Sequence, residues 1–188
     1  MPPDSDKPAK WTLRLAQLGD RLPIRAKLTA GLAQGLMSSV AAIIAYLPTK
    51  PLGLREGYWA SITAIAVVQS ELSATTSSGR DQFAGAAIGG FFSAIIVTLA
   101  GQHLATYALA VVLSMLACWL FNISSAARLA GSTATIIMLV PHQGSAEWMM
   151  LSRLAEVGWG VTVGFMTVWT VNRVERPFGK NPASPARH

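Results

Sequence analysis

A run of 46 residues from Gln82 to Ala127 contains no Asp, Glu, Lys or Arg. A soluble domain exposes charged side chains along its whole length, because nearly every surface segment must be solvated by water. A stretch this long without charge is instead typical of helices that are solvated by lipid. The composition agrees, since only 13% of the 188 residues are charged, whereas soluble domains carry about 25%. The sequence therefore predicts a polytopic membrane protein.

Six windows are apolar enough to form membrane-spanning helices, and we expect them at residues 28–47, 58–73, 82–99, 104–121, 125–140 and 154–171. Each window is near the ~20 residues that a helix needs to cross a ~30 Å hydrocarbon core. The polar segment around Glu71, Arg80 and Asp81 is expected to form a solvated inner turn. No segment shows the sustained alternation of a barrel strand. The predicted fold class is an all-α membrane protein with six transmembrane helices.

Basic residues are distributed unevenly between the predicted loops. With the N-terminus inside, twelve of the fifteen Lys and Arg residues fall on the inner side, and only Lys50, Arg55 and Arg153 fall outside. This positive-inside bias predicts a multi-pass protein of the cell inner (plasma) membrane with both termini in the cytoplasm. The expected segments are a basic N-terminal segment (1–26), a transmembrane domain (27–175) and a disordered tail (176–188). The N-terminal segment is either an amphipathic helix on the inner leaflet or a solvated arm that sets topology.

Three windows carry two glycines four residues apart, a spacing that lets another backbone approach one helix face closely. The pairs are Gly31 with Gly35, Gly85 with Gly89, and Gly160 with Gly164. They predict a tightly packed bundle, with contacts either inside one protomer or between protomers. The third and sixth windows resemble each other around their glycines, and the second and fifth both carry hydroxyl groups. This favours a 3+3 inverted repeat, as in many transporters, although so short a match also arises by chance.

The loops between the predicted helices are too short for a catalytic domain. The sequence contains no nucleophile elbow, phosphate-binding glycine-rich loop, or cluster of His and Cys at metal-ligand spacing. We therefore expect no enzyme activity, no cofactor and no metal site. The net charge of +6 is explained by membrane topology, so nucleic acid is not an expected partner.

Several motifs resemble the fusaric acid resistance and aromatic acid exporter family. The second window has Tyr58-Trp59-Ala60, then Thr63 and Val67-Val68-Gln69, Ala127-Arg128 opens the fifth window, and residues 153–160 open the sixth. The resemblance covers about residues 25–176 and extends distantly to the aluminium-activated malate transporters. It implies a transporter that exports small organic anions, such as aromatic carboxylates. The alternatives are a passive anion channel and a non-transporting membrane subunit that assembles or anchors a partner.

Two departures from the family pattern qualify the resemblance. Many members have an arginine three residues before the first glycine of the third span, where this chain has Gln82. Many also carry a large cytoplasmic domain or a second membrane half, and this chain has neither. We therefore expect a half-size unit that forms a homo-oligomer, with a periplasmic adaptor protein as a further candidate partner.

Positive charge at the ends of the predicted helices favours the binding of a carboxylate. Arginines occupy such positions at both mouths, with hydroxyl and aromatic groups between them. The candidate substrate-binding residues are Arg80, Arg128, Arg153, Tyr58, Trp59, Ser61, Thr63, Thr133 and Thr135. Structural roles stay open as alternatives. Arg128 can snorkel to the interface, Arg153 can pair with Glu156, and the hydroxyls can bond to their own helix or to a neighbouring one.

Overall fold

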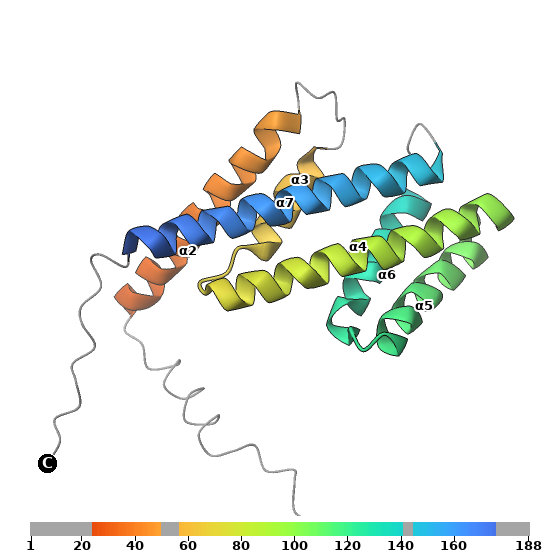
Figure 1. Cartoon of the computed structure of the whole chain (residues 1–188), viewed down its shortest axis with the longest axis horizontal. Helices are drawn as coiled ribbons and strands as arrows, with labels where there is room; N and C mark the ends of the chain where they lie inside the picture. Colours follow the sequence, from red (N-terminus) through yellow and green to blue (C-terminus); the bar gives the residue numbers. More distant parts are fainter. Residues whose placement is uncertain (1–23, 50–56, 141–144, 176–188) are drawn as a thin grey trace, which may run out of the picture. The chain divides into compact units, whose positions relative to one another are not determined.

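The structure is a computed structural model that describes residues 24–49, 57–140 and 145–175. These residues form six α-helices and two short 3₁₀ segments, without a strand in the described ranges (Figure 1). The helices are α2 (Ile24–Tyr46), α3 (Tyr58–Val67), α4 (Leu72–Ala100), α5 (Leu104–Leu120), α6 (Ala127–Leu139) and α7 (Ala146–Glu175), and the 3₁₀ segments are η1 (Leu47–Thr49) and η2 (Ser124–Ala126). The predicted all-α fold with six helices is confirmed. The expected N-terminal segment and C-terminal tail lie almost wholly outside the described residues.

The six helices are unequal in length, which the sequence windows did not predict. Three segments are long and apolar enough to cross a membrane: Ile24–Thr49, Leu72–Ala100 and Ala146–Val174. The 10 residues of α3 and the 13 of α6 extend only about 15 Å and 20 Å, at 1.5 Å per residue. The expected inner turn is wrong for Arg80 and Asp81, because α4 begins at Leu72 and includes both, whereas Glu71 lies in the non-helical connection before α4.

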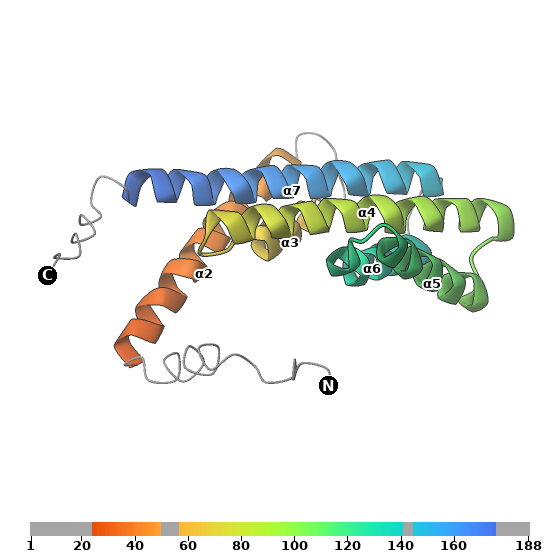
Figure 2. The same cartoon turned by 60° about the horizontal axis from the view of Figure 1, so that its bottom comes forward.

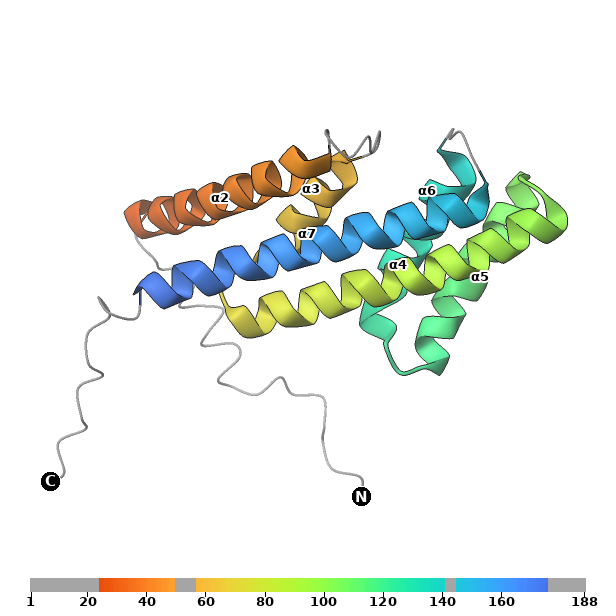
Figure 3. The same ribbon diagram turned by 45° about the horizontal axis from the view of Figure 1, so that its top comes forward.

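The chain divides into two compact units, Met1–Leu36 and Met37–His188. The first unit contains the beginning of α2 with Gly31 and Gly35, and their role in packing stays a prediction. In the second unit, α4 and α7 run antiparallel, side by side (Figures 1 and 2). The short helix α3 packs on α7, while α6 packs on α4 and α5 packs on α6 and α4 (Figure 3).

The glycine pair of α4 lies against the short helix α6. A Cβ atom at Gly85 would lie 3.1 Å from the carbonyl oxygen of Ala126, and one at Gly89 would overlap the carbonyl oxygen of Ala130. No side chain larger than hydrogen fits there without moving backbone. The glycines therefore allow the backbone of α6 to rest directly on α4.

The glycine pair of α7 receives the other short helix, α3, in the same manner. A Cβ atom at Gly160 would lie 2.5 Å from the carbonyl oxygen of Ala60, and one at Gly164 would lie 3.4 Å from that of Ala64. In both contacts the residue numbers rise together, so each short helix runs parallel to the long helix that carries it. Two of the three predicted glycine pairs thus lie at helix contacts inside one protomer.

Side chains from neighbouring segments bond to the last carbonyl groups of both short helices. The Ser78 hydroxyl donates to the carbonyl oxygen of Ala66 in α3 at 3.2 Å. The Gln102 side-chain amide donates to the carbonyl oxygen of Ile137 in α6 at 3.4 Å. The end of a helix leaves carbonyls without an intrahelical partner, and these bonds satisfy one of them at each end.

Candidate functional site

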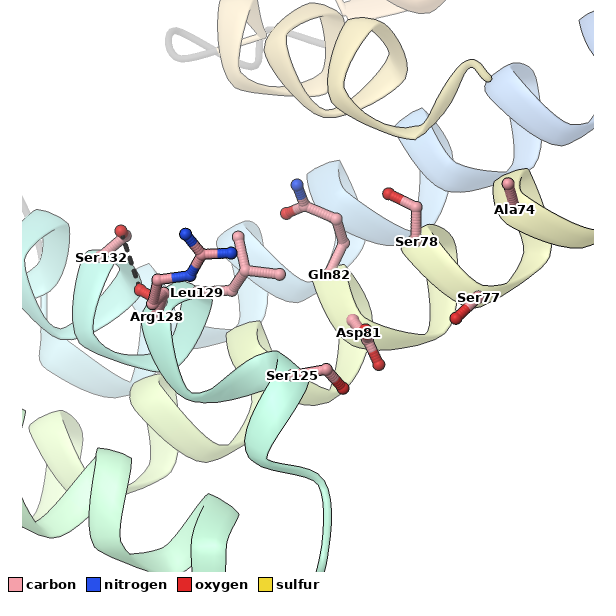
Figure 4. A pocket seen from close by; sticks show the side chains of 9 residues that line it. All are labelled: Ala74, Ser77, Ser78, Asp81, Gln82, Ser125, Arg128, Leu129 and Ser132. Carbon is pink, nitrogen blue, oxygen red and sulfur yellow. Dashed lines mark hydrogen bonds between the residues drawn. The ribbon is translucent and has the colours of Figure 1, made fainter. Parts of the chain in front are cut away.

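A hollow of about 590 Å³ opens between the first half of α4 and the start of α6 (Figure 4). We call it the Arg128 pocket. Polar side chains predominate in its lining, which consists of Ala74, Ser77, Ser78, Asp81, Gln82, Ser125, Arg128, Leu129 and Ser132. The pocket exists because α4 stays helical through its polar segment and so places that segment beside η2 and α6. It lies within the size range of sites for small molecules, about 300–1,000 Å³.

The charges of the Arg128 pocket are one cation and one carboxylate. Arg128 is exposed, and in Figure 4 its guanidinium group and the Gln82 amide project on the same side of the lining. Asp81 is half-buried and has Arg80 as an ion-pair partner, with Nη2 3.7 Å from Oδ1. Arg80 itself extends into solvent with 71% of its side chain exposed, so its attraction for Asp81 is screened. The pocket therefore offers an accessible guanidinium group beside several neutral hydrogen-bonding groups.

Arg153 occupies a different environment, in the interior of the packed helices. It is 7% exposed, and its Nη1 lies 3.9 Å from Oε2 of Glu156, which is 3% exposed. The Ser152 hydroxyl donates to the other oxygen of Glu156 at 3.4 Å. The guanidinium carbon of Arg153 lies 4.3 Å from the ring centroid of Trp59, a cation–π contact. The structure thus shows the Arg153–Glu156 pairing that the sequence left as an alternative.

We define the Arg153 cluster as Ser152, Arg153, Glu156 and Trp59. Tyr58 extends it, because its ring centroid lies 5.1 Å from that of Trp59. The indole nitrogen of Trp59 is buried without a hydrogen-bond partner among the described residues. The predicted aromatic residues therefore gather around Arg153, and neither of them lines the Arg128 pocket.

The four predicted hydroxyl-bearing residues also lie outside the lining of the Arg128 pocket. Ser61 donates to the carbonyl oxygen of Ala42 at 2.9 Å. Thr135 donates to the carbonyl oxygen of Gly131 at 2.9 Å. Thr63 and Thr133 are buried, with 2% and 4% exposure. Ser61 and Thr135 thus serve helix structure, as the structural alternative proposed.

Sequence reasoning missed most of the residues that line the pocket with Arg128. These are Ser77, Ser78, Asp81, Gln82, Ser125 and Ser132. Three of them, Ser77, Ser78 and Asp81, belong to the polar segment that was interpreted as a turn, and Gln82 is the first residue of the third window. The signal that could have found them is the helical spacing of Ser77, Ser78, Asp81 and Gln82, which places all four on one face if the segment is helical.

One of three comparisons with known proteins identifies a family for this chain. Residues 40–167 match the sequence profile of the fusaric acid resistance protein-like family, a range that reaches from the second half of α2 into α7. Neither the comparison with curated proteins nor that with solved structures gives a match. The matched range covers more than half of the chain and contains both the Arg128 pocket and the Arg153 cluster. The chain therefore belongs to the fusaric acid resistance protein-like family and is a membrane protein of the transporter type.

Proposed function

We propose that this protein exports small organic anions, and that the substrate carboxylate binds to Arg128. One observation carries the proposal: the Arg128 pocket places an accessible guanidinium group among five neutral polar side chains. A guanidinium group presents paired N–H donors that match the two oxygens of a carboxylate. The Gln82 amide and the hydroxyls of Ser77 and Ser125 supply further hydrogen bonds, whereas Ser78 and Ser132 donate to the carbonyl oxygens of Ala66 and Arg128. The pocket thus has the donor chemistry that an organic anion requires.

Asp81 bears on how tightly such an anion is held. Its carboxylate lines the same pocket as Arg128, so it repels an entering anion while Arg128 attracts it. A transport site must bind its substrate strongly enough to select it and weakly enough to release it. We therefore expect modest affinity, with Asp81 favouring release.

The preference for aromatic carboxylates rests on the family. Trp59 is occupied by Arg153 in this conformation, so the pocket itself supplies no aromatic ring for stacking. Its volume of about 590 Å³ nevertheless accommodates a single aromatic ring with its carboxylate. Aromatic carboxylates thus fit the pocket by size and by charge.

We also propose a membrane location, a topology and partners for this protein. The bias of basic residues supports an inner-membrane location with both termini in the cytoplasm, which places the polar first half of α4 on the inner side. A homo-oligomer and a periplasmic adaptor protein stay candidate partners. We propose no enzyme activity.

Flux measurements on purified protein in liposomes test this function. Radiolabelled benzoate is a suitable probe, and the initial uptake rate is measured for wild type, Arg128→Ala and Arg128→Lys. A hydrogen bond to a charged group contributes about 1.5–3 kcal/mol, so we expect Arg128→Ala to lower the rate by about tenfold to a hundredfold. The lysine variant should retain part of the rate, because it keeps the charge without the paired donors.

Arg173→Ala is the matched control, since Arg173 is also exposed but lies in the last turn of α7. Equal rates for Arg128→Ala and Arg173→Ala would contradict the assignment of the site. Absence of flux in wild type would favour the non-transporting subunit. Flux without accelerated exchange against internal unlabelled benzoate would favour the passive channel.

A further inference from the structure

The two long helices carry the same sequence pattern at matching positions. In α4 and in α7, a serine, an acidic residue and two glycines follow one another at intervals of four residues. The sets are Ser77, Asp81, Gly85 and Gly89 in α4, and Ser152, Glu156, Gly160 and Gly164 in α7. Residues spaced by four lie in one stripe along a helix. Each long helix therefore presents a hydroxyl, a carboxylate and a glycine contact in the same order.

The correspondence extends to the short helices that the glycines hold. Gly85 meets Ala126 as Gly160 meets Ala60, and Gly89 meets Ala130 just as Gly164 meets Ala64. In both pairs, a step of four residues along the long helix corresponds to a step of four residues along the short helix. The pair of α4 with α6 thus has the same register as the pair of α7 with α3. The match rests on two features together: the equal spacing of the serine and the acidic residue before the glycines, and the carbonyl group of a preceding alanine at each glycine.

The residue before the first contacting alanine differs between the pairs. It is Ser125 beside α4 and Trp59 beside α7. Around α4 the position is open, since Ser77, Asp81 and Ser125 all line the Arg128 pocket. Around α7 it is closed, because Trp59 lies over Arg153 at 4.3 Å and Glu156 is 3% exposed. The small side chain of Ser125 thus leaves the space beside α4 open, whereas Trp59 fills the corresponding space beside α7.

We propose that the Arg153 cluster is a second binding position for the transported organic anion, built on the stripe of α7 that matches the stripe of α4 in the Arg128 pocket, with its cation on the long helix instead of the short one, and closed in this conformation by Trp59. The inference rests on the proposed function. Since α4 and α7 are antiparallel (Figure 2), equivalent positions on them face opposite sides of the membrane, as in transporters with inverted repeats. When the ring of Trp59 leaves Arg153, the guanidinium group becomes accessible from the side opposite to the Arg128 pocket.

Glu156 holds the place of the substrate carboxylate while this position is closed. It lies 3.9 Å from Arg153, within the reach of an attractive charge pair in a medium of low dielectric. An entering organic anion would bind the exposed guanidinium group in place of, or beside, Glu156. In one conformation the Arg128 pocket is open, and in the other the Arg153 cluster is open. The anion binds to each position only when that position is open.

Cysteine labelling tests the sidedness of the two equivalent positions. Cys118 is buried and is first replaced by Ser, after which Ser77→Cys and Ser152→Cys provide matched reporters on α4 and α7. A membrane-impermeant maleimide is added to sealed right-side-out and inside-out vesicles. We expect the cysteine at 77 to react from one side only, and the cysteine at 152 to react at least tenfold more slowly from either side.

Removing the ring of Trp59 should open the second position. In a Trp59→Ala background, we expect the cysteine at 152 to react at least tenfold faster, and only from the side opposite to that of the cysteine at 77. Trp148→Ala is the matched control, because Trp148 is exposed on α7, and it should change neither rate. If Trp59→Ala does not give a monodisperse protein, Trp59→Leu removes the cation–π contact while keeping an apolar side chain.

Two outcomes overturn the inference: labelling of both cysteines from the same side, or an unchanged rate at 152 in a monodisperse Trp59 variant. Labelling requires no substrate, so it is independent of the flux assay. Opposite sidedness without benzoate flux would contradict the proposed function alone. Benzoate flux with labelling from one side only would contradict the second binding position alone.

Discussion

Gly160→Ala is the substitution for which the structure gives the sharpest expectation. The added Cβ atom would lie 2.5 Å from the carbonyl oxygen of Ala60 and 2.8 Å from Cβ of Thr63, and neither a backbone oxygen nor a Cβ atom can rotate away. Overpacking of this kind costs about 1–3 kcal/mol. Alanine in place of glycine favours the helix by up to about 1 kcal/mol. The net expectation is a loss of about 0–2 kcal/mol in the free energy of unfolding.

Gly158→Ala is the control that gains the same helix propensity without a steric overlap with α3. Gly158 lies in the same helix, and a Cβ atom there would be 3.5 Å from the ring of Phe83, an ordinary van der Waals contact. The same gain in propensity therefore applies without the overlap. The free energy of unfolding of Gly160→Ala should fall below that of Gly158→Ala by about 1–3 kcal/mol.

Reversible unfolding in mixed micelles measures this difference. The purified variants are titrated with a denaturing detergent, and far-UV circular dichroism follows the loss of helix. Thermal midpoints give a second measure, at about 2–4 °C per kcal/mol for a chain of this size. Equal stability of Gly160→Ala and Gly158→Ala would refute the close approach of α3 to α7.

Two further predictions concern packing and charge. Gly89→Ala should destabilise the protein more than Gly90→Ala. The new Cβ atom meets the backbone of α6 at position 89 but only the movable side chain of Met150 at position 90. A reversed order of stability in unfolding titrations would contradict this prediction. Arg153→Ala should cost about 3–5 kcal/mol, since it leaves Glu156 buried without that cation. Arg80→Ala should cost little, because Arg80 is exposed and its attraction for Asp81 is screened. Equal thermal midpoints for the two variants would count against the buried pair.

The sequence predicted the helices and the glycine contacts because each depends on local patterns. Apolar windows determine which segments lipid can solvate, and glycine spacing determines where a backbone can approach. The pairs at Gly85 and Gly160 were therefore visible before the structure. The partner helix of each pair was not, because it depends on which helices become neighbours in three dimensions.

The lining of the Arg128 pocket was predicted only in part, because it too depends on which helices become neighbours. Arg128 was identified from its charge and its place at the start of a helix, and it lines the pocket. Arg153 has the same residue type at a similar boundary, yet it is buried against Trp59. Residue type alone does not distinguish these two arginines, since Arg128 lies exposed on the short helix α6, whereas Arg153 lies buried on the long helix α7.

The polar segment of α4 was misread because polarity was taken as evidence of exposure to water. A ten-residue α3 extends only about 15 Å, half of a ~30 Å hydrocarbon core, and irregular backbone inside a membrane needs protein partners. Ser78 bonds to the carbonyl oxygen of Ala66 at 3.2 Å, and the backbone N–H of Gln69 donates to the Thr75 hydroxyl at 3.2 Å. The hydroxyl groups of α4 thus satisfy the end of its short neighbour. The same half of α4 lines the Arg128 pocket, where Ser77 and Gln82 provide the donors for an anion.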